Sequence, residues 1–510
     1  MITLVFNREE YEYDCYALVT SFYPGEETKQ LIGEASDGED APLPDRVRIT
    51  ALPEERRAEV FFSAGEVLPA DRRYTMEKAG DFKKAFKQFF YETLTDYTGR
   101  RLPWGSLTGV RPTKLILSVA AEEAEKLAFS AAKTDDVMQN GGQEKRLKDA
   151  VVSRMQREYR VSEEKAALGL KIALLEDRIL QKYRGGGYSL YIGIPFCPSR
   201  CLYCSFLSYT IESQKKKIAD YLECLKKEMT ATMEIMNGQR PDTVYIGGGT
   251  PTALDADGLH RLLSDVDAVF FGGGMPDEYT VEAGRPDSIT KEKLEVMKEF
   301  GVSRISVNPQ TFHQETLDLI GRRHTVKETI EAYELARSMG FDNINMDLIL
   351  GLPGEGPDEV RATLDRVREL SPDSLTVHSL ALKRASKMRD WVREHGALLG
   401  IDYDAVMRYA QETANLLGMD PYYLYRQKNI AGSLENTGFA KEGKYGLYNI
   451  IIMEEVQSIY AIGAGTVSKK VYTDGSGRIE RCDTHKDLSL YLSDIQAMIE
   501  RKRKLFGEDK

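Results

Sequence analysis

Three cysteines lie within eight residues of the chain, at Cys197, Cys201 and Cys204. Thiolates at this spacing can each bind one iron of a cubane iron–sulfur cluster and leave its fourth iron without a protein ligand. Clusters that only carry electrons are normally held by four cysteines, and here Ser205 and Phe206 follow directly. An iron with an open coordination site can bind a small molecule, so the spacing predicts a cluster that takes part in chemistry.

Two other interpretations of these cysteines stay open at this point. Structural zinc is one, although zinc usually takes four ligands in two paired groups, and no histidine lies between Tyr188 and Met236. Buried structural cysteines are the other, because this spacing also places them on one face of a helix. Pro195 and Pro198 flank the first cysteine, which favours a loop. The other cysteines, Cys15, Cys224 and Cys482, are expected to have no part in the chemistry.

Polar side chains follow four of the later apolar segments. They are Glu282, Gln310, Asp347 and, after the last segment, His378 or Ser379. Each of them fits an exposed loop when it is taken singly. An apolar strand that ends in a carboxylate or an amide directs a polar group toward the ligand face of a sheet, so the repetition favours a shared site.

A glycine-rich segment and an arginine add weaker signals. Gly247-Gly248-Gly249-Thr250 allows a ligand to approach the backbone closely, but alone it also fits a tight strand-to-helix turn. Arg322 can add a cation to the same cavity, with an exposed surface arginine as the equal alternative.

The elements that position these residues alternate along the chain. Strands are predicted over residues 188–194, 243–246, 278–282, 304–307, 343–349 and 374–379, and helices over 213–236, 255–269, 290–300, 314–320, 326–339 and 357–370. Six strands separated by helices predict parallel βαβ units, arranged as a six-unit partial (β/α) barrel or as a doubly wound sheet. In both architectures ligands bind at the carboxyl ends of the strands, where the cysteine segment lies.

The two ends of the chain do not show this regular alternation of strands and helices. Strands over 2–6, 47–52 and 58–63 and a helix over 77–97 predict a small α+β unit, followed by helices over 144–159 and 162–183. Asn140-Gly-Gly is predicted to be a turn and Arg184-Gly-Gly-Gly187 a flexible break. After residue 401 come a helix over 403–417, a tyrosine-rich stretch over 422–425 and a glycine-punctuated segment over 462–465.

Composition excludes some classes of function. The 510 residues carry a formal charge of −11, with a pI near 5.4, which argues against broad attraction to nucleic acid or anionic membranes. The first residues lack a signal-peptide pattern, and no apolar run approaches the about twenty residues of a membrane span. Six cysteines are too few for a disulfide framework. We therefore expect a cytoplasmic protein without a membrane span.

Together the motifs resemble the radical S-adenosylmethionine (SAM) enzymes and, among them, the oxygen-independent coproporphyrinogen III oxidase family. The resemblance rests on C-x3-C-x2-C and on Tyr191-Ile-Gly-Ile-Pro-Phe-Cys197, Tyr203-Cys-Ser-Phe206, Gly247-Gly-Gly-Thr-Pro-Thr252 and Asp347-Leu-Ile-Leu-Gly-Leu-Pro353. It spans about residues 188–467. The segment Pro103-Trp-Gly-Ser-Leu-Thr-Gly-Val-Arg-Pro-Thr-Lys114 fits the longer type with an N-terminal extension. The implied domains are an extension over 1–185, a radical SAM partial barrel over 186–382 and a mixed, substrate-covering C-terminal domain over 383–510.

The resemblance implies two cofactors, a [4Fe-4S] cluster and SAM, and chemistry that starts with cleavage of SAM to a 5′-deoxyadenosyl radical. The implied cluster ligands are Cys197, Cys201 and Cys204. The implied SAM contacts are Tyr191, Tyr203, Gly248, Gly249, Thr250, Glu282, Gln310, Arg322, Asp347 and Ala381. Tyr191, Glu282 and Asp347 are the candidate catalytic residues. The implied partners are a porphyrinogen or haem-type tetrapyrrole and a low-potential electron donor of the flavodoxin or ferredoxin class.

The reaction implied by the resemblance is oxidative decarboxylation of two propionates of coproporphyrinogen III, which gives protoporphyrinogen IX in haem biosynthesis. Two alternatives are a haem chaperone, which binds and transfers haem, and an anaerobic haem-degrading methyltransferase. The family's decarboxylases usually have a histidine where this chain has Gly193 and a further cysteine where it has Phe206. Relatives without that cysteine include haem-handling proteins that do not decarboxylate.

Overall fold

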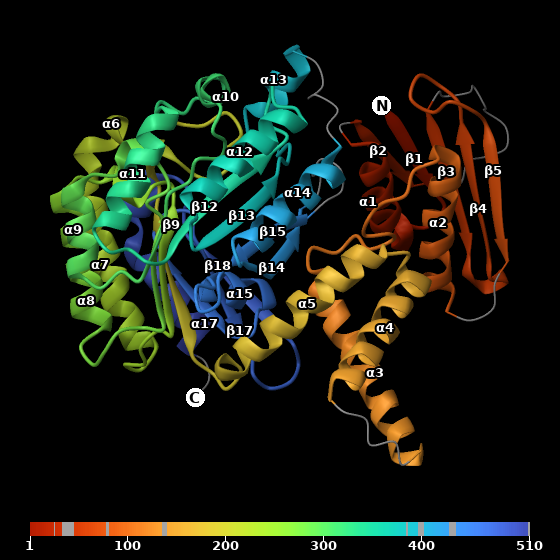
Figure 1. Cartoon of the computed structure of the whole chain (residues 1–510), viewed down its shortest axis with the longest axis horizontal. Helices are drawn as coiled ribbons and strands as arrows, with labels where there is room; N and C mark the ends of the chain where they lie inside the picture. Colours follow the sequence, from red (N-terminus) through yellow and green to blue (C-terminus); the bar gives the residue numbers. More distant parts are fainter. Residues whose placement is uncertain are drawn as a thin grey trace. The chain divides into compact units, whose positions relative to one another are not determined.

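The computed structural model describes residues 1–24, 26–32, 45–77, 81–134, 140–383, 386–395, 402–427 and 435–507. It divides the chain into two compact units (Figure 1). The first combines Met1–Leu174 with Leu424–Glu435, and the second combines Leu175–Tyr423 with Asn436–Lys510. The division of the chain into three domains at residues 185 and 382 stays a prediction.

The first unit begins with a five-stranded sheet in the order β2-β1-β3-β4-β5. Its strands are β1 (Ile2–Phe6), β2 (Thr28–Ile32), β3 (Arg46–Leu52), β4 (Arg57–Ser63) and β5 (Arg72–Glu77). The helices α1 (Glu12–Phe22) and α2 (Phe82–Thr98) share a hydrophobic core with the sheet. The helix predicted from residue 77 therefore begins later, because residues 72–77 pair with β4 as a strand and Asp81 caps α2 by accepting from Lys84 N at 3.2 Å.

Three long helices follow in the chain, α3 (Pro112–Thr134), α4 (Asn140–Tyr159) and α5 (Glu163–Leu180). The turn predicted at Asn140-Gly-Gly is wrong, since α4 begins at Asn140. Glycine costs helix stability mainly in the helix interior, and the first backbone N–H groups of a helix have no intrahelical partner to lose. A second core surrounds the fully buried Trp104 in this unit.

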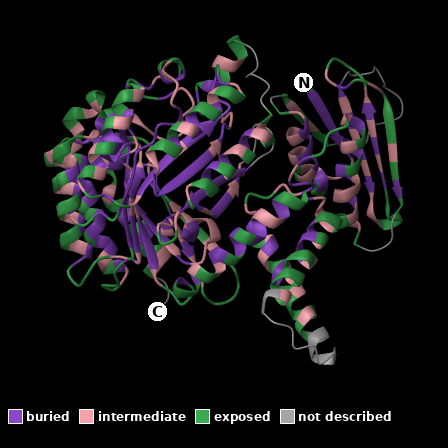
Figure 2. Cartoon of the chain, viewed as in Figure 1, coloured by how far each residue is buried: buried purple, intermediate pink, exposed green. Residues whose placement is uncertain are grey.

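The sheet of the second unit confirms the predicted α/β fold. Six strands pair in parallel and in chain order: β6 (Tyr188–Ile194), β9 (Thr243–Gly248), β10 (Glu278–Val281), β11 (Arg304–Ser306), β12 (Ile344–Leu350) and β13 (Ser374–Ser379). A doubly wound sheet would reverse its strand order at a switch point. The unbroken order is that of a partial (β/α) barrel, and these strands are buried along most of their length (Figure 2).

Helices connect consecutive strands and lie outside them (Figure 1). They are α7 (Ile218–Ile235), α8 (Ala256–Phe270), α9 (Lys291–Glu299), α10 (Gln314–Leu319), α11 (Val326–Ser338) and α12 (Pro357–Leu370). Each begins close to the predicted residue except α7, which the short helices α6 (Ile211–Gln214) and η4 (Lys215–Lys217) precede. Leu259, Leu262 and Val266 show why α8 forms, because residues three and four apart share its buried face.

The C-terminal part of the chain extends the same sheet. On one side β16 (Ser458–Ile462) pairs in parallel with β6, and β17 (Val467–Val471) and β18 (Ile479–Asp483) continue antiparallel. On the other side β15 (Glu435–Ala440) pairs antiparallel with β13, and β14 (Asp420–Arg426) follows. The helices of this part are α13 (Met388–His395), α14 (Tyr403–Leu416), α15 (Leu447–Glu454), α16 (Leu488–Ser493) and α17 (Ile495–Gly507). No helix in the described part of the chain is long and apolar enough to cross a membrane.

Candidate active site

The cysteine segment leaves the sheet at the carboxyl end of β6. Phe196 and Cys197 form the short strand β7 (Phe196–Cys197), which pairs with β8 (Tyr209–Thr210) and closes the loop that carries all three thiols. The glycine-rich segment at the end of β9 holds this loop. Gly249 N donates to Ile194 O at 2.8 Å, and Thr250 N donates to Phe196 O at 2.7 Å. Two neighbouring strand ends are thus joined through backbone hydrogen bonds.

The three thiols are unpaired and lie in a polar surrounding. Thr250 Oγ1 donates to Cys197 Sγ at 3.5 Å, and Arg285 Nη1 donates to Cys201 Sγ at 3.6 Å. Burial raises the pKa of the Cys197 thiol to about 11 and also raises the pKa of Cys204. Thiolates are the form that binds iron, so loading a cluster must displace these protons.

Glu282 follows β10 and faces the glycine segment. Tyr245 Oη donates to its Oε1, and Gly248 N donates to its Oε2 at 3.2 Å. A Cβ at Gly247 would lie 2.7 Å from Glu282 Oε2, so only glycine leaves room for the carboxylate there. Burial raises the pKa of Glu282 to about 7.

Three tyrosines form an aromatic layer beside Glu282. Tyr191 and Tyr245 lie opposite each other on β6 and β9, with ring centroids 6.1 Å apart. Tyr448 of α15 stacks on both, at 6.0 Å from Tyr191 and 4.5 Å from Tyr245. Of these three tyrosines, only Tyr191 was a predicted site residue. Tyr245 could have been added from the pairing of β6 with β9, whereas Tyr448 reaches the layer only through the tertiary fold.

Gln310 and Asp347 lie together past the ends of β11 and within β12. Gln310 N donates to Asp347 O at 2.9 Å, and Ile349 N donates to Gln310 O at 3.0 Å. Gln310 has a left-handed backbone with φ of 68°, which is uncommon for a residue other than glycine. Asn345 Nδ2 donates to Asp347 Oδ1 at 2.7 Å, and His378 Nε2 lies 3.9 Å from the same oxygen.

Arg322 is buried, with 5 % of its surface exposed, so the alternative of a surface arginine is wrong. Its Nη1 donates to Asn308 O and, at 3.4 Å, to Pro309 O. Tyr203 and Cys201 are its neighbours on the cysteine loop, and burial raises the pKa of Tyr203 while the Arg322 charge opposes that rise. The cation therefore faces the thiols.

A second buried arginine, Arg285, lies beside the cysteine loop and was not among the predicted site residues. Arg285 Nη1 donates to Ser199 Oγ at 3.0 Å as well as to Cys201 Sγ. Its Nε and Nη2 donate to the two oxygens of Asp287 at 2.9 and 2.7 Å, and His324 Nδ1 lies 3.7 Å from Asp287 Oδ1. A cation three residues beyond the strand-end Glu282 was the signal available in the sequence.

Some candidates stay outside this cluster of contacts. Ala381 lies two residues past β13, where its carbonyl oxygen accepts from Lys383 N at 3.0 Å. Ser379 is buried, and its backbone N–H donates to Asn436 Oδ1 at 2.9 Å. Cys15 belongs to the core of the first unit, Cys224 lies on α7 and Cys482 on β18, all apart from the cysteine loop.

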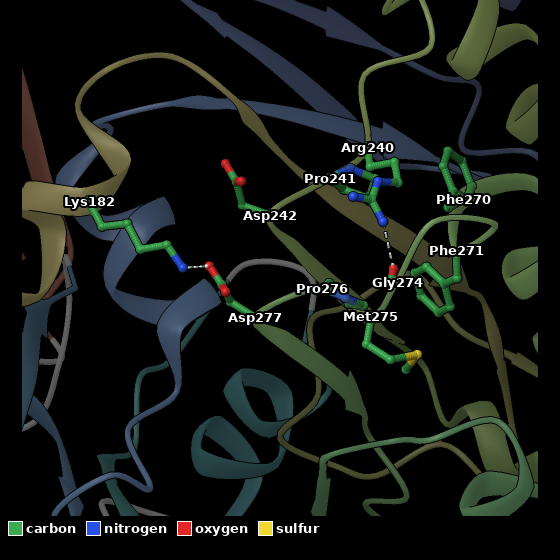
Figure 3. A pocket seen from close by; sticks show the side chains of 10 residues that line it. All are labelled: Lys182, Arg240, Pro241, Asp242, Phe270, Phe271, Gly274, Met275, Pro276 and Asp277. Atoms are coloured by element: carbon green, nitrogen blue, oxygen red, sulfur yellow. Dashed lines mark hydrogen bonds and ion pairs between the residues drawn. The ribbon is translucent and has the colours of Figure 1, made fainter.

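A pocket of about 300 Å³ lies at the opposite ends of the strands, next to the residues that precede β9 and β10. Lys182, Arg240, Asp242 and Asp277 supply its charged groups (Figure 3). Lys182 Nζ pairs with Asp277 Oδ2 at 2.5 Å, and Arg240 Nη1 donates to the Gly274 carbonyl oxygen at 3.0 Å. None of the predicted site residues lines this pocket, which is therefore separate from the candidate active site.

The comparisons with known proteins agree with this geometry. Residues 191–367 match the profile of the radical SAM superfamily. The chain is also 40% identical to the oxygen-independent coproporphyrinogen-III oxidase-like protein HemZ of Bacillus subtilis, over 80% of this chain and 79% of that protein. The chain belongs to this radical SAM family. Its cofactors are a [4Fe-4S] cluster and SAM.

Two further proteins are similar to parts of this chain. Heme chaperone HemW of Bacillus subtilis is 39% identical over 38% of this chain and 51% of that protein. The structure of coproporphyrinogen III oxidase (HemN) from Escherichia coli, a radical SAM enzyme, aligns with a TM-score of 0.50 at 22% identity, over 64% of this chain and 73% of that one. At that identity the likeness shows a shared fold.

The residues present fit both cofactors. The three thiols lie on one loop and supply one cysteine for each of three irons, although no group of three metal-binding side chains is already gathered in the described part of the chain. Gln310 Oε1 and Arg322 Nε are buried without a hydrogen-bond partner among the described residues, and buried polar atoms in that state require a ligand or water. A Cβ at Gly249 would lie 2.6 Å from Phe196 O, so the glycine segment lies directly against the cluster loop.

Proposed function

We propose that this radical SAM protein oxidatively decarboxylates two propionate side chains of coproporphyrinogen III to vinyl groups, giving protoporphyrinogen IX. The observation that carries the proposal is the 40% identity to an oxidase-like relative over 79% of that relative's length. It is supported by the three thiols, which lie at the same rim of the barrel as Glu282 and Arg322.

The proposed cofactor contacts are those that the family resemblance implies, and the site geometry supports most of them. Cys197, Cys201 and Cys204 bind the cluster. Gly248, Gly249 and Thr250 offer backbone groups and a hydroxyl to the methionine part of SAM. The remaining polar contacts are Glu282, Gln310, Arg322 and Asp347, with Tyr191 and Tyr203 nearby; Ala381 is proposed from the family resemblance alone. When bound, the cluster and SAM supply the one-electron cleavage that generates a hydrogen-abstracting radical.

The side chains of the chain itself would form the walls of this site and position its polar groups. Tyr191, Tyr245 and Tyr448 form a layer of stacked rings beside the half-buried Glu282, and a bound ligand that covers this layer would strengthen each polar contact beneath it. Glu282 is held in place by Tyr245 and Gly248 and can accept from ribose hydroxyls. We assign the electron to a low-potential donor of the flavodoxin or ferredoxin class.

The direct experiment is anaerobic turnover of the reconstituted protein with SAM, a strong reductant and coproporphyrinogen III. The expected products are 5′-deoxyadenosine, carbon dioxide and protoporphyrinogen IX. Cleavage of SAM without release of carbon dioxide would remove this substrate from the proposal and leave the cofactor assignment standing.

A haem chaperone is the second candidate, and three observations favour it. The chain is 39% identical to a heme chaperone over 197 residues. A Cβ at the buried Gly193 would lie 2.6 Å from Thr466 Cγ2, so the histidine of the family's decarboxylases has no room there. Phe206, which replaces the additional cysteine, is 63 % exposed.

Mixing the protein with haem separates the candidates. Stoichiometric binding of unchanged haem, together with no turnover of coproporphyrinogen, would support the chaperone. Opening of the haem ring in the presence of SAM would instead support a haem-degrading methyltransferase.

A further inference from the structure

Arg285 is a buried guanidinium that contacts the proposed cluster loop directly. Only 3 % of its surface is exposed, and its Nη1 donates to both Cys201 Sγ, at 3.6 Å, and Ser199 Oγ, at 3.0 Å. It comes from the segment after β10, three residues beyond Glu282. A single side chain therefore joins the strand end that carries Glu282 to the loop that carries the thiols.

The Arg285 side chain is held rigidly. Its Nε and Nη2 donate to the two carboxylate oxygens of Asp287 at 2.9 and 2.7 Å. Such two-point pairs fix orientation as well as distance. His324 packs behind Asp287, with its Nδ1 3.7 Å from Asp287 Oδ1. The direction of the guanidinium toward Cys201 is thus set by the protein.

The charges around Cys201 do not cancel. Arg322, the second buried cation here, donates to the carbonyl oxygens of Asn308 and Pro309 and not to a carboxylate. Burial lowers the pKa of His324, which favours its neutral form. Arg285, Arg322 and the Asp287 carboxylate together leave about one positive charge beside Cys201. A buried excess charge is costly unless a counter-charge is present, and a cluster with three thiolates is an anion.

We propose that Arg285, oriented by Asp287, is a positioning residue that raises the reduction potential of the [4Fe-4S] cluster through its hydrogen bond and charge at Cys201. Reduction adds one electron and no atoms, so the reduced cluster carries one more negative charge. A nearby cation stabilises that state more than the oxidised one, and hydrogen bonds to cysteine sulfur act in the same direction. The inference rests on the proposed assignment of Cys201 as a cluster ligand, and it does not depend on the tetrapyrrole.

The test is a redox titration of the reconstituted protein without substrate, with dithionite as reductant and the EPR signal of the reduced cluster as the readout. Arg285→Met should lower the midpoint potential. We expect at least a tenfold fall in the ratio of reduced to oxidised cluster at a fixed solution potential, which is about 59 mV for a one-electron couple. Arg285→Lys keeps a charge and should recover part of the shift.

A variant that should change the midpoint potential in the opposite direction distinguishes an electrostatic effect from disruption of the local structure. Asp287→Asn removes the negative charge that offsets Arg285 but keeps an amide oxygen that accepts from its guanidinium, so it should raise the midpoint potential. Arg323→Met is the matched control, because Arg323 is an exposed arginine beside Arg322 whose charge is screened by solvent, and its potential should not move.

Two results would overturn the inference. One is an unchanged potential in Arg285→Met; the other is a shift of the same sign in Asp287→Asn and Arg285→Met. If Arg285→Met does not fold or does not bind a cluster, the change in midpoint potential of Asp287→Asn decides. A midpoint potential that does not rise in Asp287→Asn would then overturn the inference. Cys201→Ala tests the underlying ligand assignment separately, since it should abolish the cluster signal itself.

Discussion

Glu282 combines partial burial with a position directly after the end of β10. Its carboxylate accepts from Tyr245 Oη and Gly248 N, and burial raises its pKa to about 7. A carboxyl group with that pKa changes its charge in the range where proteins are normally assayed. Its role in binding SAM is therefore open to a pH test.

We predict that SAM binds about tenfold more weakly at pH 6 than at pH 8, because protonation below pH 7 removes the carboxylate that accepts its hydroxyl groups. Glu282→Gln should bind SAM weakly and without this pH dependence. Calorimetric titration of the oxidised, cluster-loaded protein measures both. A pH-independent affinity in the unchanged protein would contradict the role given to Glu282.

Gly249 provides the second prediction for a single residue. A Cβ there would lie 2.6 Å from Phe196 O and 2.8 Å from Ile194 O, both backbone atoms of the strand that leads to the cysteines. Gly249→Ala should therefore displace this backbone, cost about 1–3 kcal/mol and weaken SAM binding. Gly272→Ala is the control, because a Cβ at Gly272 meets nothing within 4 Å. Equal urea midpoints for the two variants would show that the contact is not strained.

The cysteine loop and the strand-end side chains could be located from the sequence because their information is local. Spacing places Cys197, Cys201 and Cys204 on one loop, and Glu282 is recognised as the residue that ends an apolar strand. Arg285 and Tyr448 could not be assigned in this way. Tyr448 lies on a helix about 200 residues away from Tyr245 in the sequence, and its contact is created only by tertiary packing.

Helices α7 and α17 are joined by a buried ion pair in the second unit. Lys502 Nζ donates to Glu228 Oε1 and to Ala461 O, both at 2.5 Å, and each charged residue is 1 % exposed. Glu228 Oε2 also accepts from Gly463 N at 2.8 Å and from Tyr491 Oη at 2.5 Å. The pair thus connects the last helix to the strand that lies beside β6.

Lys502→Met should lower the free energy of unfolding by about 3–5 kcal/mol, because it leaves the Glu228 carboxylate buried without its cation. Adding Glu228→Gln removes that isolated charge and should recover much of the loss. Urea unfolding followed by circular dichroism compares the variants. A loss below about 1 kcal/mol in Lys502→Met would contradict a buried, paired Glu228.

The pattern of apolar residues predicted the bounds of helices and strands well where the apolar residues are the buried ones. Strands β1, β6 and β13 and helix α12 have the predicted bounds, because apolar runs and a proline at the first helical position mark them. Strand β5 was missed because its residues Arg72 to Glu77 are mostly exposed, which gives little hydrophobic pattern. The strands after residue 435 were not predicted either, since their pairing partners are distant in sequence.

Glu435 contacts residues of the first unit although it lies far from them in the sequence. It is fully buried, accepting from Lys165 Nζ at 2.6 Å and from Trp104 Nε1 at 2.7 Å. Residues 424–435 thereby belong to a unit that otherwise ends at Leu174. Sequence patterns cannot show such an insertion, because they carry no information on contacts between residues 331 positions apart.

Glu435→Gln should destabilise the first unit by about 3 kcal/mol, since it leaves the Lys165 ammonium buried without a counter-charge. The chain has two tryptophans, so in a Trp391→Phe background the fluorescence of Trp104 follows this unit during urea unfolding. Glu442→Gln, which changes an exposed carboxylate, is the control. An identical urea midpoint in Glu435→Gln and Glu442→Gln would contradict the buried pair.

The measurement that tests the central claim most directly is anaerobic turnover with coproporphyrinogen III labelled with carbon-13 in its propionate carboxyl groups. We expect labelled carbon dioxide and protoporphyrinogen IX, formed together with 5′-deoxyadenosine. The Cys201→Ala variant should form none of these three products. Unlabelled gas and intact coproporphyrinogen, from protein that carries its cluster and cleaves SAM, would contradict the central claim.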